Sequence, residues 1–315
     1  MTQSIDALVN ALNNMPEVAA TTIESNKNVV YTGCGDSLAS AYVASRKGAR
    51  AYSAGDIEWM EEIPAKTDVM VGISNSGTSG ATIRALRRAS EQGCETVAIT
   101  ASPDSVMASE AKELQLIPPL RVEEQVPVAG HLALAIGVAA TCGYSVEGIA
   151  KKVAVGIEKM KPVINETVAK LPKNMPSAIT VLSLPELRSA GNFATLKFME
   201  ATGIAARDVP LEECGHVDYF VGPQDHLVLS MRGTRGKARF ERLERALDEN
   251  GQSIIPIDFD LISDGGKEPI DDLARELVAA VVVTFISIEA ATLWNRLPFR
   301  GGAVNMDASH IKIEI

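Results

Sequence analysis

The feature that most constrains the fold is an apolar run that ends in a loop of small residues and continues as a helix. Residues 69–74 read Val-Met-Val-Gly-Ile-Ser and predict a buried strand. The loop Asn75–Gly80 follows, and residues 81–92 have helical composition. Two more strands are predicted at residues 29–32 and 96–100. Strands that alternate with helices in this way indicate βαβ units and a parallel sheet.

The second half of the chain repeats this pattern. The Gly-Thr-x-Gly core of the loop recurs 156 residues later, within Ser230–Gly236, and residues 251–258 match 93–100 at an offset of 158. Two markers with nearly the same offset indicate duplication of one α/β unit. A length of 315 residues suits two domains. We therefore predict domains at residues 1–156 and 157–315, with a Lys-rich helix over 151–171 linking the halves.

Charge and hydropathy narrow the class of protein. The net charge of −10 disfavours nucleic acid as a partner, because binding a polyanion needs a basic surface. The N-terminal residues lack a basic segment followed by an apolar one, so no signal peptide is expected. The longest apolar run, Leu277–Ile288, is too short for a membrane span and predicts a buried helix. The four cysteines lack metal-type spacing, and we expect free thiols in a cytoplasmic protein with no metal.

The first loop has the composition of a phosphate-binding site. It lies at the carboxyl end of a predicted parallel strand, where ligands bind in open α/β sheets, and it opens a helix whose N–H groups suit an anion. Gly77 and Gly80 let the backbone curl close to a ligand. The side chains that supply neutral donors are Ser74, Asn75, Ser76, Thr78 and Ser79. The alternative is an ordinary Ser/Gly turn that caps a helix, and composition alone leaves both open.

Three weaker signals lie elsewhere. The turn Gly33–Ser37 follows a strand and is either a tight turn or a ligand contact. Lys197 and Glu200 are three residues apart on a predicted helix and so share a face, a spacing that on its own favours a surface ion pair. His216 is a lone histidine, which is more often structural than catalytic. Cys34 and Cys214 are expected to be small packing residues.

Taken together, these motifs resemble the sugar isomerase (SIS) family. The motifs are Gly-Cys-Gly-Asp-Ser at 33–37, Ser-Asn-Ser-Gly-Thr-Ser at 74–79, and Leu-Lys-x-x-Glu at 196–200 with Gly-His downstream. The pattern is similar to the isomerase half of glucosamine-6-phosphate synthase and to related amino-sugar-phosphate deaminases and isomerases. The resemblance implies two tandem SIS domains, each a flavodoxin-like three-layer αβα sandwich.

The resemblance also implies roles for individual residues. The 74–79 loop would hold the substrate phosphate. The sugar would be contacted by Cys34, Gly35, Asp36, Ser37, Val128 and Ala129. Glu200 would move a proton between the first and second sugar carbons, with Lys197 in the same motif, and His216 would assist ring opening from the neighbouring subunit of a homodimer. No cofactor is implied.

Some residues depart from the family pattern. No glutaminase domain precedes the motifs, and Gly-His-Val-Asp at 215–218 replaces the usual His-Gly-Pro. Ser309 or His310 lies near the position of the synthase's tail lysine, so a tail contact with the substrate is one expectation. The leading hypothesis is an aldose–ketose isomerase, or deaminase, acting on a hexose or hexosamine 6-phosphate. The alternatives are a phosphosugar sensor without activity and a bifunctional phosphoglucose/phosphomannose isomerase.

Overall fold

The computed structural model describes residues 3–21, 23–217, 220, 225–262 and 269–296. The chain divides into two compact units. Among the described residues, the amino-terminal unit comprises Asn14–Val122 and Ala129–Ile149, and the carboxy-terminal unit comprises helix α1 (Ile5–Asn13), Glu123–Val128 and residues 150–296. Residue 156, the predicted end of the first domain, lies inside helix α7 (Ile149–Lys170).

The amino-terminal unit is built on a five-stranded sheet with strand order β2-β1-β3-β4-β5. Every neighbouring pair is parallel. The interior strand β3 is buried along its whole length, because helices cover both faces of the sheet. The strands are β1 (Val29–Gly33), β2 (Arg50–Ser53), β3 (Val69–Ile73), β4 (Glu95–Thr100) and β5 (Glu113–Leu116).

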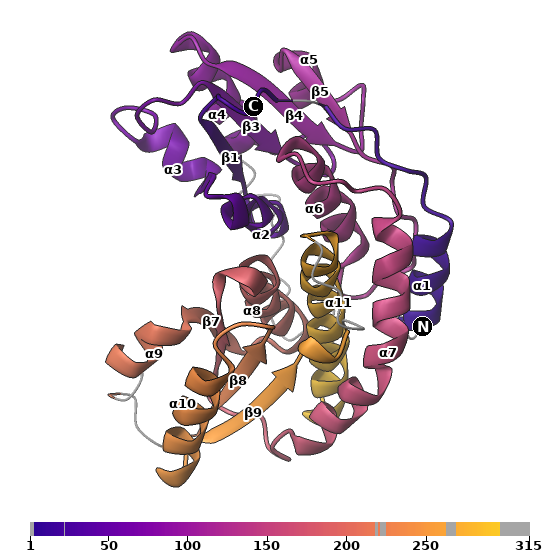
Figure 1. The fold of residues 1–315 in the computed structure, drawn as a ribbon, viewed down its shortest axis with the longest axis vertical. Helices are drawn as coiled ribbons and strands as arrows, with labels where there is room; N and C mark the ends of the chain where they lie inside the picture. The colour runs from indigo at the N-terminus through magenta and orange to yellow at the C-terminus, as the bar shows by residue number, and fades with distance from the viewer. Residues whose placement is uncertain (1–2, 22, 218–219, 221–224, 263–268, 297–315) are drawn as a thin grey trace. The chain divides into compact units, whose positions relative to one another are not determined.

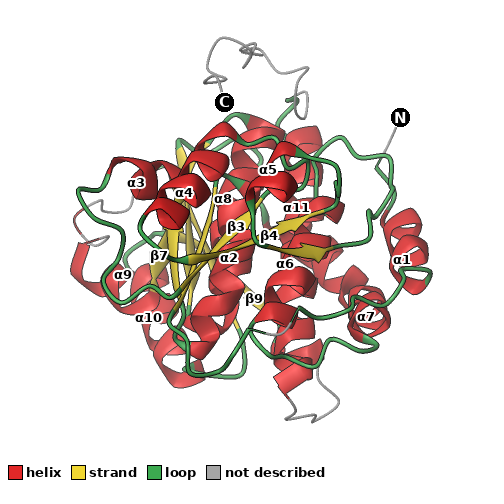
Figure 2. Cartoon of the chain, turned by 90° about the horizontal axis from the view of Figure 1, so that it is seen from above, coloured by secondary structure: helices red, strands yellow, loops and turns green. Residues whose placement is uncertain are grey.

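Helices form a layer on each face of this sheet (Figure 2). On one face α3 and α5 pack against α4, and their apolar side chains join Val30, Met70 and Ala98 of the strands in one core cluster. On the other face α2 packs against α6. The helices are α2 (Asp36–Ala41), continued by a 3-10 turn over Tyr42–Lys47, α3 (Ala54–Trp59), α4 (Gly80–Glu91), α5 (Val106–Glu110) and α6 (Ala129–Thr141).

The carboxy-terminal unit repeats the architecture with one strand fewer. Its sheet has the order β7-β6-β8-β9, which is the order of the first four strands of the other sheet, and all pairs are again parallel. The repeat found in the sequence is therefore a repeat of strand order. The strands are β6 (Ala178–Ser183), β7 (Ala205–Pro210), β8 (His226–Arg232) and β9 (Ser253–Asp258).

Helices also cover both faces of the second sheet (Figure 1). Phe240 of α10 joins Leu211 and Cys214 of α9 in a core cluster over β6 and β8. On the other side α8 packs against α11 and against β6 and β7. The helices are α8 (Arg188–Thr202), α9 (Leu211–Val217), α10 (Lys237–Glu249) and α11 (Pro269–Leu293).

Helix α11 contains the apolar run 277–288. Among the described residues, its segment Asp271–Leu293 has the length and composition of a membrane span, and 83% of its most apolar window is buried within the fold. Leu277, Val281 and Ile286 are all fully buried. The prediction of a buried core helix at this run is confirmed.

Candidate functional site

The loop after β3 presents unpaired backbone donors at the start of a helix. Parallel strands end at one edge of the sheet, and the loop from Ser74 leaves this edge and enters α4 at Gly80. Within the described chain, the N–H groups of Ser79 and Gly80 have no protein acceptor. Ser79 is the N-cap of α4, and its side chain makes no capping hydrogen bond. Two unpaired N–H groups at the positive end of a helix dipole suit an oxyanion.

Gly77 gives this loop its shape. Its φ of 65° lies in the left-handed region, and an added Cβ would overlap the side chain of Ser105. The surrounding backbone holds the glycine in place, since Gly77 C=O accepts from the N–H of Met107 at 3.1 Å. Thr100 Oγ1 also donates to the Asn75 carbonyl at 3.1 Å. Strands β3 and β4 and helix α5 therefore fix the loop as a rigid unit.

The predicted phosphate ligands divide into exposed side chains and one that shapes the loop. Asn75, Ser76 and Thr78 are exposed, and the hydroxyls of Ser76 and Thr78 lie 2.8 Å apart. Ser74 is buried, and its Oγ accepts from the Gly77 N–H at 3.1 Å. The hydroxyl of Ser74 thus stabilises the loop itself, and an anion would contact the exposed side chains of Asn75, Ser76 and Thr78 instead.

The Gly-Cys-Gly-Asp-Ser turn lies beside this loop at the same edge of the sheet. Strands β1 and β3 are parallel neighbours, with Thr32 opposite Gly72, so their carboxyl ends are adjacent. Gly35, with φ of 53°, is the N-cap of α2, and Cys34 is exposed. The structure thus brings together the predicted phosphate loop and the predicted sugar turn. The expectation that Cys34 is a packing residue is wrong, because the turn projects it into solvent.

The start of α6 contributes residues that the sequence analysis did not single out. Gly130 faces the side-chain amide of Asn75, and a Cβ there would lie 3.7 Å from the amide carbon. His131 is buried, and its Nδ1 lies 2.9 Å from Ser40 Oγ on α2. A lone His in an apolar helix carries no signal by itself, so only the fold reveals this pair. Val128 and Ala129, the predicted sugar contacts, are both buried.

Lys197 and Glu200 form a pair on α8 in the carboxy-terminal unit. Lys197 Nζ donates to Glu200 Oε2 at 2.8 Å and lies 4.5 Å from the ring centroid of Phe193. The Lys197 side chain is 0% exposed, and that of Glu200 is 28% exposed. The spacing-based expectation of a surface ion pair is therefore wrong. The buried Lys197 instead holds in position a carboxylate that solvent can still reach.

His216 lies on α9 and is exposed. Leu211 and Cys214 anchor this short helix in the core, and the prediction that Cys214 is a packing residue is confirmed. Ser309 and His310, the predicted tail contacts, lie outside the described residues. Within the described part of the chain, no cluster of three or more His, Cys, Asp or Glu side chains could hold a metal ion.

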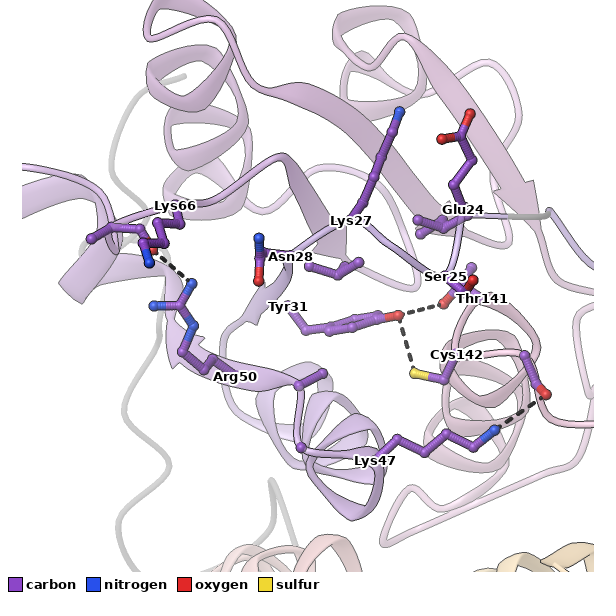
Figure 3. A pocket seen from close by; sticks show the side chains of 16 residues that line it. Glu24, Ser25, Lys27, Asn28, Tyr31, Lys47, Arg50, Lys66, Thr141 and Cys142 are labelled. Atoms are coloured by element: carbon purple, nitrogen blue, oxygen red, sulfur yellow. Dashed lines mark hydrogen bonds between the residues drawn. The ribbon is translucent and has the colours of Figure 1, made fainter.

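A pocket lies at the opposite, amino edge of the first sheet and contains none of the predicted site residues (Figure 3). It has a volume of about 570 Å³. Three of its cations already have partners: Lys27 pairs with Glu95 at 2.7 Å, Lys47 donates to the Gly143 carbonyl, and Arg50 to that of Ala65. At its floor the Tyr31 hydroxyl accepts from Cys142 Sγ at 3.1 Å, and burial raises the pKa of this thiol to about 11. We therefore place the candidate site at the carboxyl edge.

Comparisons with known proteins find a family match in the first half of the chain and solved structures of the same fold. Residues 22–136 match the family model described as the SIS domain, and no curated protein matches the sequence significantly. A glucosamine-6-phosphate deaminase from Thermotoga maritima has a TM-score of 0.71 at 16% identity, over 93% of this chain and 92% of its own. A tagatose-6-phosphate ketose/aldose isomerase from Escherichia coli has a TM-score of 0.70 at 16% identity, over 93% of this chain and 88% of its own. The C-terminal domain of a glucosamine-fructose-6-phosphate aminotransferase from Francisella tularensis has a TM-score of 0.67 at 12% identity, over 93% of this chain and 94% of its own. At these identities the likeness establishes the fold alone.

Proposed function

Because residues 22–136 of this chain are a SIS domain, we propose that the protein is an aldose–ketose isomerase of phosphosugars built from two tandem domains of this family. The substrate class is a hexose or hexosamine 6-phosphate, with deamination as the variant reaction for an amino sugar. Two proteins of the same fold are a glucosamine-6-phosphate deaminase and a tagatose-6-phosphate isomerase, and their names support this class.

The observation that carries the proposal is the pair of unpaired N–H groups of Ser79 and Gly80 at the start of α4. With the exposed side chains of Asn75, Ser76 and Thr78, they would surround the three terminal oxygens of a phosphate monoester. The phosphate is remote from the reacting carbons, so its binding energy serves to position them. The adjacent turn at Cys34–Ser37 would then contact the sugar hydroxyls.

Glu200 is the proposed base. In the open-chain aldose, its carboxylate would take the proton from the second carbon, and the electron pair would form the C1–C2 double bond of a cis-enediolate with the negative charge on the first oxygen. The hydroxyl proton of the second oxygen would pass to the first oxygen, and the same carboxyl group would return its proton to the first carbon, which yields the ketose and regenerates the carboxylate. Lys197 would hold the carboxylate in position through its 2.8 Å hydrogen bond. His216 would move the proton of the ring oxygen, supplied by the partner subunit of a homodimer.

A panel of sugar phosphates tests the proposal. Hexose and hexosamine 6-phosphates should raise the melting temperature of the protein, and at least one should be isomerised or deaminated. Replacing Ser76 and Ser79 together with alanine should remove most of the thermal shift, because two hydroxyl donors at the phosphate are lost. Ser109→Ala, an exposed serine on α5 whose hydroxyl donates to the Val106 carbonyl, is the matched control.

The panel also separates the enzyme from a sensor. Stabilisation by several sugar phosphates without any conversion would favour a binding protein that lacks activity. An unchanged thermal shift in the double variant would mean that the phosphate binds elsewhere.

A further inference from the structure

The second copy of the phosphate loop is occupied by a side chain of the protein itself. In the loop that follows β8, the Thr234 N–H and hydroxyl donate to Glu186 Oε2 at 3.2 and 2.9 Å, and the Arg235 N–H donates to Glu186 Oε1 at 2.9 Å. Glu186 comes from the 3-10 turn Pro185–Leu187 after β6 and is only 6% exposed. Three donors of one loop therefore converge on one carboxylate.

The loop backbone is shaped around this carboxylate. A Cβ added to Gly233 would overlap the carboxyl group of Glu186, and one of the carboxylate oxygens lies 2.9 Å from that position. Gly236, with φ of 68°, is the N-cap of α10. The close approach of a glycine backbone to an anion at a helix start is the arrangement typical of phosphate loops.

The two loops occupy equivalent places in the two sheets. Each follows the third strand in the shared order, β3 or β8, and opens the next helix, α4 or α10. Thr234 corresponds to Thr78 and Arg235 to Ser79 at the offset of 156 residues. In the first loop the N–H of Ser79 has no acceptor among the described residues, whereas in the second loop the N–H of Arg235 donates to Glu186.

The second loop has two arginines where the first has serines, and one of them, Arg232, is engaged within the protein, whereas Arg235 is exposed. Arg232, at the position of Ser76, donates through Nε to Glu244 Oε1 at 2.8 Å and through its terminal nitrogen to Oε2. Ser230 Oγ donates to the same carboxylate at 2.6 Å. The guanidinium is thus neutralised by a buried partner and adds no positive charge to the loop.

We propose that the second loop is an anion-binding site whose resident anion is the Glu186 carboxylate. Its native state excludes phosphate and keeps the chain to a single phosphosugar site, and removing the carboxylate opens a site for a small tetrahedral oxyanion. The proposal rests on the proposed function only in treating the first loop as a phosphate site.

Hydrogen exchange on the wild-type protein is the first test. We expect the amides of Thr234 and Arg235 to be protected without any ligand and to be unaffected by inorganic phosphate, because an acceptor is already in place. Slower exchange of these amides on adding phosphate to the wild type would overturn the proposal.

Glu186→Ala is the second test. In this variant the same amides should exchange at least about tenfold faster, and inorganic phosphate should restore their protection and raise the melting temperature by about 2 to 4 °C more than in the wild type. Glu276→Ala is the control, since Glu276 is equally buried and accepts from the Ser189 N–H at 2.8 Å, outside the loop. It should lose stability without this response to phosphate.

The outcomes separate this proposal from the proposed function. If phosphate does not slow exchange of the Thr234 and Arg235 amides in Glu186→Ala, the proposal that Glu186 is the resident anion is wrong. An equal response to phosphate in Glu276→Ala would have the same meaning. Neither result would bear on the proposed phosphate site in the first loop. If sugar phosphates do not slow amide exchange in the first loop, residues 74–80, that result would count against the proposed function alone. Should Glu186→Ala fail to fold, the wild-type exchange measurement still decides the question.

Discussion

At the scale of single residues, the site depends on backbone shape as much as on side-chain chemistry. Gly77 is needed for its positive φ and for its contact with Ser105, neither of which a larger residue tolerates. Sequence analysis identifies the serines and glycines of the loop, but not which of them act within it. Ser74 Oγ accepts a hydrogen bond from the Gly77 N–H, and only the fold shows that this hydroxyl points into the loop.

The Gly77 contact yields a prediction with a matched control. Gly77→Ala should destabilise the protein by about 1 to 3 kcal/mol more than Gly93→Ala, because overlap with Ser105 adds to the strain of a positive φ. Gly93 has φ of 82° and nothing within 4 Å of an added Cβ. Urea unfolding of both variants measures the difference, and equal losses would show that the loop can move away from Ser105.

The cysteines should differ sharply in reactivity. Cys34 is exposed at the proposed sugar turn, whereas burial raises the pKa of Cys142 to about 11 and keeps its thiol protonated. Because the thiolate is the nucleophile, iodoacetamide at mildly alkaline pH should label Cys34 first. Peptide mass spectrometry reads the labelling, and a bound sugar phosphate should slow it. Preferential labelling of Cys142 or the buried Cys214 would contradict the structure.

At the scale of elements, periodicity predicts the buried parts well and the edges poorly. The strands expected near residues 29–32, 69–74 and 96–100 are all present, because each is an apolar run covered on both faces. The edge strands β2, β5 and β7 were not predicted. Their partly exposed sequences, such as Glu-Leu-Gln-Leu in β5, give no continuous apolar run.

The helices that carry the proposed base and the pair Ser40–His131 were only partly predictable from sequence. The predicted helix containing Lys197 and Glu200 is confirmed. Their spacing favoured a surface pair, and the burial of Lys197 depends on tertiary packing that spacing does not encode. The pair Ser40 and His131 joins two helices far apart in the sequence, so no local pattern could reveal it.

At the scale of the whole molecule, the two halves of the chain share one strand order. Among the described residues, however, the Ser79 N–H of the first loop has no protein acceptor, whereas Glu186 accepts from the equivalent Arg235 N–H of the second loop. One copy is thus suited to binding phosphate, and the other carries the proposed base on α8. In the proposed homodimer, His216 acts in the site of the partner subunit.

Subunit mixing tests that arrangement. Glu200→Gln and His216→Asn should each be nearly inactive alone, whereas a refolded equal mixture should regain about a quarter of wild-type activity, since half of the random dimers contain one intact site. Activity is measured on the sugar phosphate identified by the panel. No recovery in a mixture shown to form mixed dimers would mean that His216 acts within its own subunit or not at all.

The most direct test of the account follows the proton itself. Isomerisation is run in deuterium oxide, and deuterium at the carbon next to the substrate carbonyl is measured by mass spectrometry for the wild type and for Glu200→Gln. We expect incorporation by the wild type and a loss of at least about a hundredfold in the variant, with the phosphosugar-induced thermal shift retained. Equal incorporation by both proteins would contradict the claim that Glu200 carries the proton.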